Sequence, residues 1–127
     1  MSDIKKQVHQ KFKVFVAELA PDNSIGALAD EVAGFARNAK IAAKSIGVEY
    51  LESAKLLLIT LGYRDDEPYY PIQLHCVSLG KIDAKGHDFI ALEQAMGEAA
   101  EKYPNIICHE LYLTAEQDFL MVFMTHG

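Results

Sequence analysis

The sequence predicts an α+β fold in which two N-terminal helices precede a ββαββ unit. Up to about residue 46, apolar side chains recur at steps of three and four, which is the spacing of amphipathic helices. Two nearly continuous apolar runs, at residues 56–61 and 119–124, are typical of strands that are buried on both faces. A further helical pattern lies between these runs and completes the order ααββαββ.

The first helix is expected at residues 3–19. Its apolar stripe consists of Ile4, Val8, Phe12, Phe15, Val16 and Leu19. Pro21 disfavours helical geometry in the residue before it and therefore ends this helix. The second helix is expected to begin near Asn23 or Ser24, either of which can cap it by accepting a hydrogen bond from a free backbone N–H, and to end before Gly47. Residues 1–47 would then form a helical hairpin.

The remaining residues, 48–127, supply the sheet. Strands are expected at residues 55–63, 70–82, 105–113 and 118–125, and the third helix at residues 83–102. Consecutive strands would form two hairpins, the second of which loosely echoes the first, although no internal repeat of solenoid period is found. The first and fourth strands are the most apolar and belong at the centre, which gives a mixed four-stranded sheet of order 2-1-4-3. The third helix would cover one face, and the N-terminal helices or a partner subunit the other.

Composition limits the classes of function. The chain of 127 residues is half apolar and carries a net charge of −6, so it is expected to be a single domain with a substantial core. An acidic surface argues against nucleic acid and anionic membrane as partners. The sequence has no apolar run long enough to span a membrane and no signal-peptide pattern at its N-terminus. We therefore expect a cytoplasmic protein with reduced cysteines.

The clearest candidates for chemistry are two Cys-His pairs. His75 and Cys76 lie on one predicted strand, and Cys108 and His109 lie on another. Thiolate and imidazole are good zinc ligands, but neighbours on a strand point to opposite faces. With the predicted sheet order the two histidines would also lie roughly 14 Å apart, at opposite edges. We therefore expect no metal and no cofactor, and cysteines that are buried, unlinked and inert.

A polar turn at residues 63–70 places tyrosines beside charged side chains. Arg64 could pair with an anion, and Tyr63, Tyr69 and Tyr70 could form the walls of a site for a small polar ligand. A charged hairpin loop with its aromatic rings folded onto the end of the sheet accounts for the same residues.

Three classes of function remain open. The favoured interpretation is an oligomerising or small-ligand-binding module that forms a homodimer or a larger assembly, because the apolar residues exceed what one layer of helix can cover. The alternative is a small enzyme with a polar site at a subunit interface, built from His75, His109, Tyr112 and Arg64. The third is a metal or redox protein that uses Cys76 and Cys108.

Overall fold

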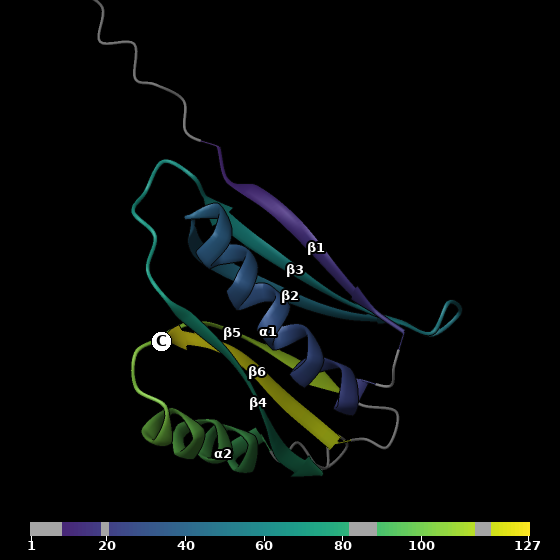
Figure 1. Cartoon of the computed structure of the whole chain (residues 1–127). Helices are drawn as coiled ribbons and strands as arrows, with labels where there is room; N and C mark the ends of the chain where they lie inside the picture. Colours follow the sequence, from purple (N-terminus) through teal and green to yellow (C-terminus); the bar gives the residue numbers. More distant parts are fainter. Residues whose placement is uncertain (1–8, 19–20, 82–88, 114–117) are drawn as a thin grey trace, which may run out of the picture.

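The computed structural model describes residues 9–18, 21–81, 89–113 and 118–127 and contains two separate three-stranded antiparallel sheets (Figure 1). In chain order the elements are β1 (Lys11–Ala17), α1 (Pro21–Ala39), β2 (Ala42–Leu51), β3 (Leu56–Arg64), β4 (Ile72–Lys81), α2 (Phe89–Lys102), β5 (Ile106–Leu113) and β6 (Asp118–His126). Sheet A has the strand order β1-β3-β2, and sheet B has the order β4-β6-β5.

The predicted N-terminal helical hairpin is wrong. Within the described residues, the first element is strand β1, and the predicted second helix is divided into α1 and strand β2. In β1 the apolar side chains of Phe12, Val14 and Val16 alternate with neighbours that face the other way, which is the period of a strand. Gly47 lies inside β2 opposite Thr60 and does not end a helix. The expected stripe residues Ile4, Val8 and Leu19 lie outside the described residues.

The predicted four-stranded sheet is also wrong. Four strands are present at the expected places, as β3, β4, β5 and β6, but β3 pairs with β1 and β2 and not with β4. The central position of β6 beside β5 is confirmed, and β4 takes the other side of β6. β3 is central, but in a different sheet. The order 2-1-4-3 failed because the apolar pattern of β3 marks a central strand without identifying its neighbours. The predicted start of the third helix, residues 83–88, lies outside the described residues.

The chain consists of two βαββ units with the same topology. β1-α1-β2-β3 builds sheet A, β4-α2-β5-β6 builds sheet B, and in both the last strand pairs between the other two. Strand register repeats as well, because Lys11 pairs with Tyr63 in the first unit and Gln73 pairs with Thr125 in the second. The second strand of each unit, β2 in the first and β5 in the second, has a bulge near its start. Equivalent positions in the two units can therefore be compared.

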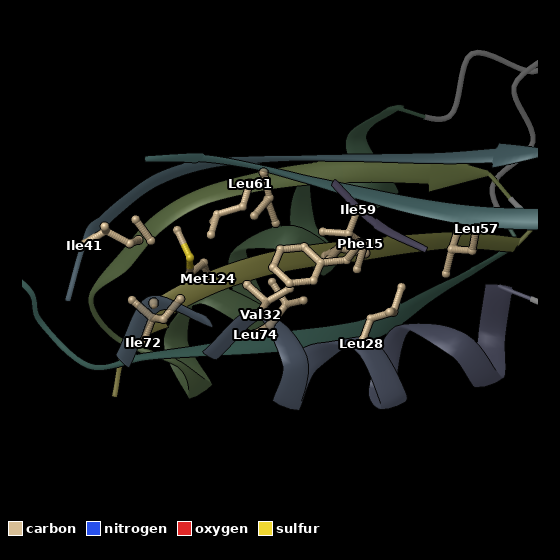
Figure 2. Close-up of a cluster of buried hydrophobic side chains, with 14 of the residues drawn as sticks. Phe15, Leu28, Val32, Ile41, Leu57, Ile59, Leu61, Ile72, Leu74 and Met124 are labelled. Atoms are coloured by element: carbon tan, nitrogen blue, oxygen red, sulfur yellow. The ribbon is translucent and has the colours of Figure 1, made fainter. Parts of the chain in front are cut away.

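The two sheets meet along β2 and β5, and α1 fills the space between them on the side of β1 and β4 (Figure 1). The main core contains buried side chains of α1 and of both sheets. They are Phe15, Leu28, Val32, Ala36, Ile41, Ala43, Ile46, Leu57, Ile59, Leu61, Ile72, Leu74, Leu120, Val122 and Met124. Figure 2 shows Leu28 and Val32 of α1 directed toward this cluster. The order of layers is sheet A, α1, sheet B and α2.

Helix α2 covers the face of sheet B that is turned away from α1. Ala99 packs on Met121 and Phe123, both of which are almost completely buried. In the register of the two units, these β6 residues correspond to Ile59 and Leu61 of β3, which face α1. Each helix therefore covers the same face of the sheet in its own unit.

Helix α1 ends in a left-handed residue. Lys40 has a φ of 54°, and the Ile41 N–H donates a hydrogen bond to the Ala36 carbonyl oxygen at 3.2 Å. This is the geometry of a Schellman motif, which favours glycine at the left-handed position. A side chain with a Cβ atom is strained in that conformation.

We expect Lys40→Gly to increase the free energy of unfolding by about 0.5–1 kcal/mol, because glycine removes the strain of the Cβ atom. Urea denaturation followed by circular dichroism would measure the change. Lys40→Ala is the matched control, since it removes the same charge but keeps the Cβ atom, and it should give no gain. Equal stabilisation by both variants would assign the effect to the charge.

Candidate interaction surface

Sheet A has one face that no described helix or strand covers, and we call it the outer face of sheet A (Figure 1). It consists of Phe12, Val14 and Val16 of β1, Ser45, Gly47, Glu49 and Leu51 of β2, and Leu56, Leu58, Thr60 and Gly62 of β3. The exposed fractions are 65% for Phe12, 49% for both Val14 and Val16, and 38% for Leu51. This is a continuous, mostly apolar surface across three strands. Surfaces of this kind mark interaction sites on soluble proteins.

Strand alternation produces this face. Phe15 of β1 points inward to the core, as do Leu57, Ile59 and Leu61 of β3, so the residues between them point outward. Lys13 belongs to the inward set and places its Nζ atom 5.8 Å from the centre of the Phe35 ring. The basic residues of β1 are thereby kept away from the outer face. Glu49 is the one charged side chain among the described residues of this face.

A hydrogen bond between two side chains crosses one corner of the outer face. The side-chain amide of Gln10 donates to the Ser45 hydroxyl at 3.1 Å, and this hydrogen bond passes over Gly62. A Cβ atom at Gly62 would collide with both side chains. The glycine therefore permits this bridge between the start of β1 and β2.

The equivalent face of sheet B is covered in the same chain. Leu120 and Val122 of β6 are buried in the main core under α1 and sheet A. Their counterparts in sheet A are Leu58 and Thr60, which lie on the outer face. The fold thus uses one copy of this face for packing and leaves the other open.

The polar turn after β3 is held by ion pairs within the chain. Arg64 makes a bidentate contact with Asp66, at 2.8 and 2.7 Å, and approaches Glu67 at 3.7 Å. Lys44 pairs with Glu67, and Lys11 pairs with Asp65, where the ammonium lowers the pKa of the carboxyl group. The guanidinium considered as a possible anion ligand is thus already paired with carboxylates of the turn.

The tyrosines of this turn pack on the protein. Tyr63 contacts the Phe35 ring edge to face, with centroids 5.4 Å apart. Tyr69 and Tyr70 are half-buried against the main core, and the Tyr70 hydroxyl donates to the Ala43 carbonyl oxygen. Burial raises the pKa of Tyr70. The structure brings Arg64 and the tyrosines to one region, but Arg64 pairs with carboxylates of the turn and the Tyr70 hydroxyl donates to the backbone.

The two Cys-His pairs do not converge. His75 on β4 and His109 on β5 both lie opposite Phe123, with β6 between them, so they are roughly 10 Å apart. Cys76 and Cys108 are also on opposite edges of sheet B, and both are free. Among the described residues there is no cluster of three or more His, Cys, Asp or Glu side chains that could hold a metal ion.

Each member of these pairs has a local environment of its own. His75 lies beside the Tyr103 ring at a centroid distance of 4.5 Å, its Nε2 is 3.0 Å from the Thr125 hydroxyl, and burial lowers its pKa. His109 is exposed, and Tyr112 is half-buried on the opposite face of β5. Tyr103 also lines a shallow depression of about 290 Å³ between α2 and β4. The proposed enzyme residues His75, His109, Tyr112 and Arg64 are therefore not gathered in one cleft of the chain.

The expectation that both cysteines are buried is wrong for Cys76. This residue lies on an edge strand and is exposed, whereas Cys108 is half-buried and accepts a hydrogen bond from the backbone of Ile46. Burial raises the pKa of Cys108 from 9.0 to about 11. The apolar context of β4 predicted burial, but Cys76 on this edge strand is exposed, although partial burial still raises its pKa.

Comparison of the chain with models of known families, with curated proteins and with solved structures finds no match. No helix in the described ranges is long and apolar enough to cross a membrane.

Sequence reasoning missed the outer face of sheet A because β1 was assigned to a helix. A signal was present, since polar and apolar side chains alternate from Lys11 to Val14. Val14 and Val16 are β-branched, which also favours a strand. The step-of-four spacing of Phe12 and Val16 fits both periods and concealed the alternation.

We expect Cys108 to react slowly with iodoacetamide at neutral pH, because only the thiolate attacks and its pKa is near 11. In Cys76→Ser, the alkylation rate should rise with pH up to about 11 with no plateau near pH 9. Cys108→Ser is the control and should react faster at pH 8, since Cys76 is exposed. A rate for Cys108 that levels off below pH 9 would contradict the assigned environment.

Proposed function

We propose that the protein is a self-associating module whose working surface is the outer face of sheet A, so that it functions as a homodimer or a larger assembly. The observation that carries this proposal is the pairing of an open apolar face on sheet A with an equivalent, covered face on sheet B. The equivalent face of sheet B, which carries Leu120 and Val122, is a packing surface within this chain. Exposing it to water in an isolated chain costs free energy that association recovers.

The chemistry of the other groups supports a binding role more than a catalytic one. The charged groups of the polar turn pair with one another, and His75 and His109 are separated by β6. An acidic net charge of −6 favours a protein partner over nucleic acid or anionic membrane. Two free cysteines on opposite sheet edges fit a reducing compartment, and we propose the cytoplasm.

The size of the surface sets the expected affinity. Three strands with about seven residues each span roughly 14 by 23 Å. This is below the ~800 Å² that each partner contributes to a standard interface. We therefore expect a dissociation constant in the micromolar range, with a monomer–dimer equilibrium that is visible on dilution.

Sedimentation equilibrium tests the proposal. The mass should rise from 14.1 kDa toward twice that value as the concentration rises from micromolar to near-millimolar. Val14→Lys places a charge in the outer face and should weaken association at least about tenfold, which is the equivalent of 1.4 kcal/mol. Val14 is half-exposed on an edge strand, so the variant should stay folded.

Ile90→Lys is the matched control, because Ile90 is an aliphatic residue of α2 with 70% exposure and lies away from sheet A. It introduces the same charge and should leave the equilibrium unchanged. A 14.1 kDa mass for the unmodified protein at every concentration would refute self-association. Equal weakening by both variants would assign association to net charge and not to the outer face.

A further inference from the structure

The outer face of sheet A is built from three rows of side chains that cross the strands. In register, the rows are Phe12–Gly62–Ser45, Val14–Thr60–Gly47 and Val16–Leu58–Glu49. The first row has its polar group on β2 and its large apolar group on β1, and the third row has the same arrangement. The middle row has small side chains at Thr60 and Gly47.

We propose that two copies pack through their outer faces of sheet A, with the middle row on the two-fold axis and β1 lying antiparallel over β1 of the second copy. This inference rests on the proposed self-association and adds the arrangement of the partner. Antiparallel sheets pack face to face at about 10 Å with their strands aligned to within about 30°. A two-fold axis along the middle row places the first row of one copy over the third row of the other.

The position of Glu49 selects this arrangement. With the axis along the middle row, the Glu49 carboxylate faces the corner of the second copy that holds Gln10 and Ser45, whose amide and hydroxyl groups are hydrogen-bond donors. With the axis along the strands, the carboxylate would instead face Val16 and would be buried without a partner. An unpaired buried charge is strongly unfavourable. The apolar groups agree with this choice, because Phe12 then faces Val16 and not Ser45.

A second copy of α2 does not fit the same face. Helix α2 turns Glu93, Gln94 and Glu101 to solvent. Placed on the outer face of sheet A, the carboxylates of Glu93 and Glu101 and the amide of Gln94 would meet apolar side chains and Glu49. The third possible occupant, the exposed row Leu111 and Leu113 of β5, is confined to one strand. Within the described residues, the outer face itself is the surface that matches it in extent and polarity, as an isologous interface requires.

Cysteine cross-linking tests the arrangement. In a Cys76→Ser/Cys108→Ser background, Val14→Cys should form a covalent dimer with a bismaleimide that spans the roughly 10 Å between stacked sheets. With the axis along the strands, the two Val14 positions would be roughly 14 Å apart, and Val14→Cys would instead link to Gly47→Cys in a mixture of the two variants. Gly47 tolerates the change, since a Cβ atom there meets Thr60 at an ordinary contact distance of 3.9 Å. Ile90→Cys is the control and should give no dimer.

A charge substitution provides a second readout that needs no cross-linker. Ser45→Lys should strengthen association severalfold at low salt and lose this gain at high salt, because the ammonium would face Glu49 of the second copy. In the alternative arrangement it would face Phe12 and weaken association.

The outcomes separate the two proposals. A Val14→Cys dimer together with stronger association of Ser45→Lys supports the arrangement. Linking of Val14→Cys only to Gly47→Cys, or masses that rise beyond the dimer, overturns the arrangement while self-association stands. Absence of any species above the monomer in the unmodified protein overturns both.

Discussion

The structure depends on a helix that is buried on two sides. Helix α1 packs on sheet A of its own unit and on β4 of the next unit, and Leu28, Val32 and Ala36 are at most 2% exposed. The alanines of α1 let both sheets approach closely. Without this helix, the apolar side chains that sheet A and sheet B turn toward it would be exposed to water. The burial of α1 therefore couples sheet A to sheet B. Contacts between β2 and β5 close the opposite side of the same core.

The two units share a topology but not a role. Helix α2 packs Ala99 on sheet B and turns Glu93 and Glu101 to solvent, and no described element lies on its outer side. No element of the described structure covers the outer face of sheet A in this way. The two units therefore end in different surfaces, the outer face of sheet A in the first and α2 in the second. We propose the outer face of sheet A as the working surface because the equivalent face of sheet B is a packing surface.

The sequence predicted the second half of the fold well and the first half poorly. The apolar runs of β3 and β6 and the helical pattern of α2 are strong local signals, and the elements lie where they were expected. Strand pairing is not local, since β1 and β3 are separated by α1 and β2 before they meet. Gly47 supplied a misleading stop signal, because it lies inside β2 and ends no helix. To locate the outer face, one must know that residues 42–51 form a strand and that β1 and β2 both pair with β3. The pairing is not encoded in any local pattern of the sequence.

All strand pairing in the described structure occurs within a unit, and this has a consequence for the connection between β3 and β4. That connection runs over the surface through the ion-paired turn, and its ends belong to different sheets. Cleavage of the backbone there would separate no hydrogen-bonded strands. The two fragments would each keep a complete sheet and would be joined by side-chain packing of α1, β2 and β5. The molecule is therefore suited to reconstitution from two pieces, in which recovery of the native state reports directly on the contact between sheets.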